Sequence, residues 1–168
     1  MKATATSFTL AFALAVASPA MAQATQSHAH HATAASADVD VPAAAEAAVA
    51  VAERFNSALS SGDLSKVEAL LAADVLILES GGAERSREEY LGHHAVSDAA
   101  FLKGAHRQLL RQRARAAGEF AWVGTESELH TQKDGKPLTV QSTETMVLKQ
   151  TTDGWRIVHI HWSSRTKR

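Results

Sequence analysis

The chain has 168 residues, among them 17 basic residues, 18 acidic residues, 9 histidines and no cysteine. A formal net charge of −1 gives no broad electrostatic reason to bind nucleic acid. The absence of cysteine excludes disulfides and a lipid anchor on cysteine, so stability has to come from an ordinary core. The length is that of one domain.

The first 22 residues are typical of a secretory signal peptide. Lys2 supplies the positive charge, residues 8–16 are apolar, and Ala20 and Ala22 are the small residues that precede a cleavage site. The apolar run is far shorter than the ~20 residues that span a bilayer, which disfavours an uncleaved anchor. We therefore expect cleavage after Ala22 and a periplasmic or secreted protein without membrane insertion.

Residues 23–45 contain alanine, threonine, serine and histidine but almost no large apolar side chains. Such a segment buries too little surface to offset its ordering entropy, so a disordered linker is predicted here. It includes His28, His30 and His31, a pattern that can bind a transition metal weakly. A polar linker that happens to contain histidines is the simpler interpretation.

Two helices and a strand are predicted next. Apolar side chains at three- and four-residue spacing indicate a helix over residues 44–60. Asp63 is expected to cap a second helix with its apolar face over residues 64–71. Residues 74–80 are rich in strand formers and end at a turn, Gly81-Gly82.

A third helix is predicted from Ser86 to about Lys103, because Ser86 and Glu89 have capping-box spacing. One stripe of this helix contains Tyr90, His94, Asp98 and Phe101. The neighbouring side chain of His93 points in another direction, so only one of the two histidines can face the sheet. We choose His94, because it shares the stripe.

The rest of the chain predicts four strands, at residues 106–116, 119–130, 138–149 and 155–163. Asp134-Gly135 and Asp153-Gly154 are typical turns between them. Helices followed by a run of strands predict an α+β domain over residues 46–164, with a curved antiparallel sheet, helices on one face and a concave pocket. Residues 165–168 form a short basic tail.

Several segments resemble the nuclear-transport-factor-2-like superfamily, in particular its SnoaL-like and ketosteroid isomerase-like members and an exported bacterial group. They are residues 78–82, 84–86, 89–90, 93–94, 98–103, 142–145 and 154–163. The resemblance implies a cone-shaped α+β fold, often dimeric through the outer face of the sheet. It implies no single activity, because members include isomerases, cyclases, hydrolases, dehydratases and binding modules.

Glu79 is the first candidate for chemistry, because it ends an apolar strand with the parity of Val75 and Ile77. Ketosteroid isomerase-like members carry a general-base carboxylate at about this point, and the resemblance implies this role for Glu79. Apolar surroundings would raise its pKa toward a useful range. The same resemblance calls for a tyrosine on the first helix. The chain's one tyrosine is Tyr90, so steroid isomerisation is not expected.

His159 and His161 are the next candidates. Strict alternation puts them on the same face as Trp155 and Ile157, which suit the packed side of the sheet. Both histidines are therefore predicted to point into the cavity, as two metal ligands or as a base with its neighbour. Histidines satisfied by hydrogen bonds in the core are the alternative.

The candidate ligand-binding residues are Tyr90, His94, Asp98, Trp122 and Glu144. Asp98 could orient the ring of His94 by a hydrogen bond. Glu144 and Glu126 lie in strands that are otherwise apolar or rich in threonine, and a buried carboxylate needs a partner. For both we favour an ion pair with an arginine or histidine across the sheet.

Three functions fit these residues. The first is an exported protein that binds a small organic molecule without a cofactor, with Glu79, His159 and His161 available for acid/base chemistry. The second is a periplasmic metal protein, with Zn or Cu held by Glu79, His94, His159 and His161. The third is a non-catalytic homodimer that associates through its sheet. The first two require Glu79, Tyr90, His94, His159 and His161 to converge on one concave site.

Overall fold

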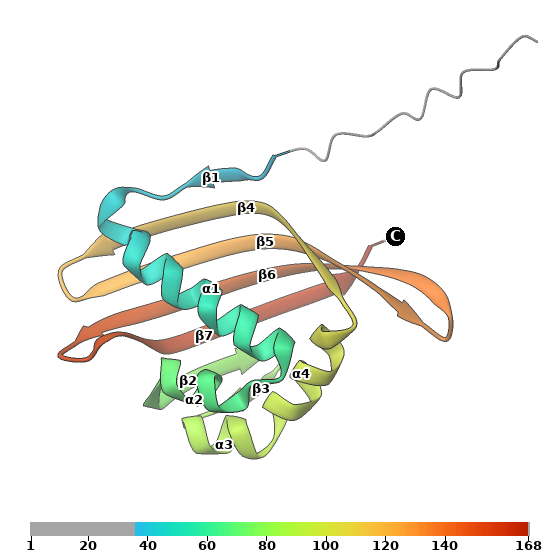
Figure 1. Cartoon of the computed structure of the whole chain (residues 1–168), viewed down its shortest axis with the longest axis horizontal. Helices are drawn as coiled ribbons and strands as arrows, with labels where there is room; N and C mark the ends of the chain where they lie inside the picture. Colours follow the sequence, from blue (N-terminus) through green and yellow to red (C-terminus); the bar gives the residue numbers. More distant parts are fainter. Residues whose placement is uncertain (1–35, 168) are drawn as a thin grey trace, which may run out of the picture. The chain divides into compact units, whose positions relative to one another are not determined.

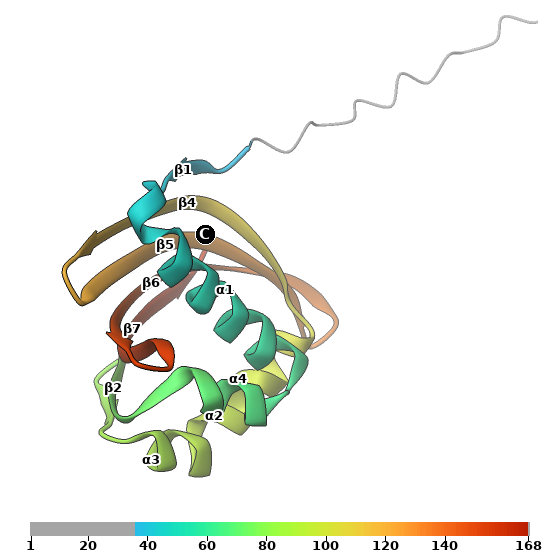
Figure 2. The same cartoon turned by 60° about the vertical axis from the view of Figure 1, so that its left-hand side comes forward.

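The computed structural model describes residues 36–167, in which helices lie on the concave face of a curved seven-stranded sheet (Figure 1). Figure 2 shows how the sheet curls around the long helix α1. The predicted signal peptide and His28, His30 and His31 lie outside the described residues. None of the helices between residues 36 and 167 is long and apolar enough to cross a membrane.

The elements in chain order are β1 (Asp38–Asp40), a 3-10 turn (Ala43–Ala45), α1 (Glu46–Ser61), α2 (Leu64–Leu70), β2 (Leu71–Glu79), β3 (Gly82–Glu84), α3 (Arg87–Gly92), α4 (His94–Lys103), β4 (His106–Ala117), β5 (Phe120–Lys133), β6 (Lys136–Thr151) and β7 (Gly154–Thr166). The sheet order is β1-β4-β5-β6-β7-β2-β3. The predicted α+β cone fold is confirmed. The sheet is mixed, since β1 pairs parallel with β4 and β2 pairs parallel with β7.

The predicted helix caps and the predicted hairpin turn are present in the structure. The side chain of Asp63 accepts the backbone N–H of Lys66 at 3.1 Å, and Ser86 accepts that of Glu89 at 3.0 Å. Asp134 and Gly135 both have positive φ, 52° and 72°, as a type I′ hairpin turn requires.

The third predicted helix is two helices. The backbone of His93 leaves the helical region at φ −125° and ψ −86°, directly after Gly92, a poor helix former. The predicted stripe is therefore interrupted. Tyr90 at the end of α3 is fully buried, while His94 at the start of α4 has a side chain that is 60% exposed.

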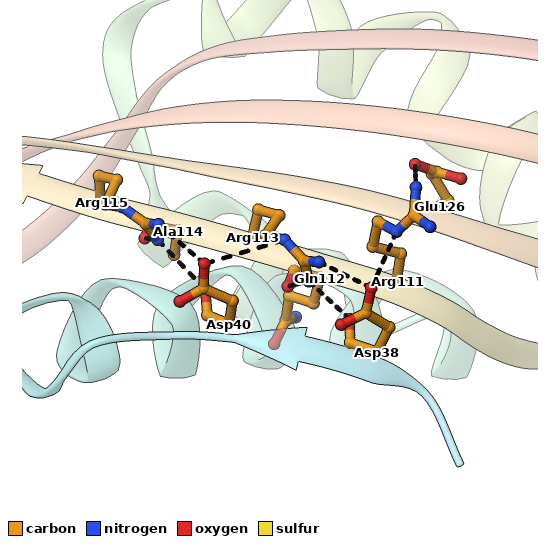
Figure 3. A network of polar contacts seen from close by, with 8 residues as sticks. All are labelled: Asp38, Asp40, Arg111, Gln112, Arg113, Ala114, Arg115 and Glu126. Atoms are coloured by element: carbon orange, nitrogen blue, oxygen red, sulfur yellow. Dashed lines mark hydrogen bonds and ion pairs between the residues drawn. The ribbon is translucent and has the colours of Figure 1, made fainter.

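Residues 38–45, predicted as part of a disordered linker, form β1 and the 3-10 turn. Asp38 and Asp40 pair with alternate arginines of β4, as Figure 3 shows: Asp38 with Arg113 at 2.7 Å and Asp40 with Arg115 at 2.8 Å. These hydrogen bonds hold the pKa of both carboxyl groups below the usual value. Composition alone missed this strand because its partner arginines lie far along the chain.

Two β-bulges change which side chains face inward. In β7, Ile157 pairs with Leu148 and His159 pairs with Val147, so Val158 is an extra residue. In β4, Leu110 is the extra residue, because Leu109 pairs with Ser127 and Arg111 pairs with Glu126. One inserted residue reverses the alternation of every side chain that follows it.

The core fills the space between α1 and the concave face of the sheet. Phe55 and Leu59 of α1, Met146 of β6, and Ile157 and Ile160 of β7 are all at most 1% exposed. Ile157 and Ile160 can both be buried only because of the bulge between them. The core occupies one end of the concave face and leaves an open space at the other.

Candidate functional site

A cavity of about 990 Å³ lies between α1, α4 and the concave face of β5, β6 and β7. Four carboxylates line it, from four different elements: Glu53, Glu79, Asp98 and Glu144. The basic residues along its lining are Arg107, Arg165 and His106. A concave site with apolar walls and a few convergent polar groups is the usual form of a small-molecule site.

The sheet contributes three cross-strand rows to the floor of the cavity. Their members pair directly across β5, β6 and β7: Thr125, Glu144 and Trp162; then Ser127, Ser142 and Ser164; then Leu129, Val140 and Thr166. The floor therefore changes from an acidic and aromatic row, through a row of hydroxyl groups, to a largely apolar row.

Glu144 is the most firmly held acid of the site. Its Oε1 accepts the amide of Asn56 at 3.1 Å and the hydroxyl of Thr125 at 3.3 Å. Its Oε2 accepts the indole N–H of Trp162 at 2.8 Å. The expected ion pair with arginine or histidine is therefore wrong for Glu144, since neutral donors hold this 9% exposed side chain. Glu126 does pair with Arg111, at 3.2 Å on the convex face.

Glu79, Asp98 and Tyr90 form the other acidic part of the site. The hydroxyl of Tyr90 donates to Oδ2 of Asp98 at 3.1 Å. Burial raises the pKa of Asp98, although the hydrogen bond from Tyr90 opposes this. Burial also raises the pKa of Glu79, with a further contribution from the negative charge of Asp98. A carboxyl group with a raised pKa can hold and release a proton closer to neutral pH.

Trp162 is the main site residue that sequence reasoning missed. Alternation without the bulge put it on the outer face of β7, whereas it lines the cavity. Its ring stacks on Phe55 with a centroid distance of 6.3 Å and lies 6.1 Å from the ring of Tyr90. Asn56 was also missed as a site residue. A polar side chain on the apolar stripe of the first helix was the signal for it.

The candidate histidines do not line the cavity. Nδ1 of His159 lies 2.8 Å from the carbonyl oxygen of Leu76, and His161 is exposed on the convex face. The bulge at Val158 explains why both predictions of orientation fail. His94 pairs with the buried Glu84 rather than with Asp98.

The five residues predicted to share one concave site are therefore only partly together. Glu79 lines the cavity. Tyr90 does not line it but contacts two residues that do, Asp98 through a hydrogen bond and Trp162 through its ring. Trp122, another candidate for ligand contact, is 43% exposed on the convex face.

The alternative metal set does not fit the geometry. Glu79 faces the cavity, whereas His159 and His161 are on the opposite side of the sheet. Among residues 36–167, no three side chains of histidine, aspartate or glutamate are grouped closely enough to hold a metal ion. We therefore derive no chemistry through Zn or Cu at these residues.

Comparisons with known proteins agree with the fold. A family model described as a SnoaL-like domain matches residues 48–166. A solved structure of a suggested ketosteroid isomerase from Shewanella frigidimarina is 36% identical, with a TM-score of 0.68, and the match covers 76% of this chain and 100% of that chain. No protein of curated function matches the sequence.

More distant solved structures share the fold alone. The CaMKII hub of S. rosetta is 20% identical, with a TM-score of 0.61, over 75% of this chain and 99% of that chain. An NTF2-like protein of unknown function in nutrient uptake from Rhodospirillum rubrum is 23% identical, with a TM-score of 0.55, over 70% of this chain and 97% of that chain.

Proposed function

Because this chain belongs to the SnoaL-like domain family, with the nuclear-transport-factor-2-like fold, we propose that it binds a small organic molecule in its cavity and that Glu79 moves a proton on that molecule. The observation that carries the proposal is a carboxyl group with a raised pKa lining a cavity of about 990 Å³. The family membership confirms the resemblance found in the sequence. His159 and His161 are given no part in this chemistry, since neither faces the cavity.

The surroundings of Glu79 support a proton-transfer role. As a base, its ionised carboxylate would remove a proton from a C–H bond beside a carbonyl group of the ligand, leaving the electron pair on the enolate. Asp98, held by Tyr90 and with a raised pKa, supplies a second group that can carry a proton nearby. Two carboxyl groups with different surroundings are a common basis for separate acid and base roles.

A screen of small carbonyl compounds tests both parts of the proposal. Ligands of the cavity should raise the melting temperature, by an amount that grows with concentration. For those ligands, NMR in D2O should show deuterium exchange beside the carbonyl group. We expect Glu79→Gln to reduce the exchange rate by about 10²- to 10⁴-fold, the usual size of a general-base contribution.

His161→Ala is the matched control and should leave the exchange rate unchanged, because this side chain lies on the convex face. Equal rates in wild type and Glu79→Gln would remove the catalytic role of Glu79. A screen in which no compound changes the melting temperature would contradict the binding function itself.

Export to the periplasm or beyond is part of the same proposal. It rests on the features of residues 1–22, namely the charge of Lys2, the short apolar run and the alanines before the expected cleavage site. Expression with this leader should yield a periplasmic protein beginning at Gln23. Intact Met1 on the protein from that compartment would contradict cleavage.

We also propose that the convex face joins two copies of the chain. Trp122, Val147 and His159 pair directly across β5, β6 and β7 on that face, and Trp122 is 43% exposed. Exposed apolar patches of this kind often mark interfaces. Fold relatives include a CaMKII hub, whose name describes an assembly.

Sedimentation of the wild type and of Trp122→Glu tests this association. The wild type should sediment as a dimer at micromolar concentration and the variant as a monomer, because an unpaired carboxylate would be buried at the interface. Glu126→Gln is a control on the same face and should remain dimeric. A monomeric wild type would contradict the proposal.

A further inference from the structure

The charge of the cavity changes from one end to the other. Thr125, Glu144 and Trp162 form the acidic row. Arg107 pairs with Leu129, which is four residues further along β5 than Thr125, or roughly 13 Å at about 3.3 Å per residue. Arg107 is therefore too far along the strands to pair with Glu144, and Nε of Arg165 donates instead to Gln141 at 3.1 Å.

The acidic end lacks a cation of its own. The donors to Glu144 are an amide, a hydroxyl and an indole N–H, none of which carries charge. No lysine, arginine or histidine between residues 36 and 167 forms an ion pair with Glu144. A carboxylate taken out of water without a cation is costly, and a positive ligand would offset that cost.

The charges of this end act on one another. Burial raises the pKa of Tyr90, and the negative charges of Asp98, Glu79 and Glu144 raise it further. Burial raises the pKa of Glu79 and Asp98, and the nearby His94 opposes this, but His94 is paired with Glu84 and is not among the residues that line the cavity. Asp98, Glu79 and Glu144 all line the cavity, and none of them forms an ion pair with another side chain of residues 36–167.

A second observation, independent of the acids, points to a ligand in the same place. Ser127 is 6% exposed and lines the cavity beside the acidic row. Its hydroxyl forms no side-chain hydrogen bond within the described part of the chain. In that part, no polar side-chain atom lacks both a hydrogen-bond partner and access to solvent, so the hydroxyl oxygen of Ser127 has such access. The hydroxyl therefore opens into the cavity, where buried polar groups normally find a partner.

We infer that the ligand of this cavity is an organic cation, a protonated amine or a related ammonium group, which lies against Glu144 and hydrogen-bonds to the serine row. The free lone pairs of Glu144 can only accept, so the ligand group must donate, as an ammonium group does. Trp162 provides an aromatic surface beside the charge, which cations favour. This inference rests on the proposed binding function and names the class of its ligand.

Three probes of similar shape and different charge test it: benzylamine, benzyl alcohol and benzoate. Their dissociation constants at pH 7 are measured by NMR, with the indole N–H of Trp162 as the reporter of the cavity. We expect benzylamine to bind at least tenfold more tightly than benzyl alcohol, and benzoate to bind most weakly.

Glu144→Gln should abolish the preference for the amine, since the amide keeps an acceptor for Trp162 but has no charge. Asp98→Asn is a second variant, which retains an acceptor for Tyr90, and it should reduce the preference. Glu126→Gln removes a carboxylate from the convex face and should leave the preference unchanged.

The outcomes separate this inference from the proposed function. Tighter binding of benzyl alcohol or benzoate would overturn the cationic ligand and leave the binding function intact. An amine preference that survives Glu144→Gln would overturn the role of the acidic row. If no probe moves the Trp162 signal at millimolar concentration and the carbonyl screen also finds no ligand, both proposals fail.

Discussion

Ile160→Ala should destabilise the protein by about 2–5 kcal/mol, the usual cost of removing a large aliphatic side chain from a core. Ile160 is fully buried, and its neighbour His161 is exposed on the convex face. His161→Ala should therefore change stability by no more than about 0.5 kcal/mol. Urea unfolding followed by tryptophan fluorescence measures both values.

This comparison tests the bulge in β7 directly. If alternation continued unbroken from Ile157, then His161 would face inward and Ile160 outward, and the two costs would be reversed. A larger loss for His161→Ala than for Ile160→Ala would contradict the bulge at Val158 and would return the histidines to the cavity.

The same bulge shows where sequence reasoning reached its limit. The parity of Val75, Ile77 and Glu79 in β2 was predicted correctly, because no extra residue interrupts that half of the strand. In β7 one inserted residue turned His159 and His161 outward. A bulge depends on how neighbouring strands pair, and nothing in the local sequence around Val158 indicates one.

Local signals predicted the elements well and their long-range contacts poorly. The capping serine Ser86 and the hairpin Asp134-Gly135 depend on neighbours in sequence, and both formed as expected. Strand β1 depends on arginines of β4, so composition assigned it to a linker. Glu144 illustrates both cases, because its place in the binding site was predicted, while its three neutral donors were not.

The candidate site combines stability and function in one residue, Trp162. Its ring packs on Phe55 and Tyr90, and its N–H holds Glu144. Because the ring of Trp162 packs in the core and also lines the cavity, a change that moves this ring also moves the carboxylate of Glu144. Packing of the core and geometry of the cavity are therefore coupled. Glu144 is thus positioned by a residue of the core rather than by a loop.

Trp162→Ala should therefore cost about 3–5 kcal/mol, because it removes a large packed ring and one donor to Glu144. Trp162→Phe keeps part of the packing and should cost about 1.5–3 kcal/mol, the usual value of a hydrogen bond to a charged group. In the Glu144→Gln background the phenylalanine variant should cost clearly less, since the acceptor no longer carries charge. Urea unfolding of the four proteins in this double-mutant cycle measures the coupling. Equal costs in both backgrounds would mean that Trp162 stabilises the protein through packing alone and that the position of Glu144 depends on Asn56 and Thr125.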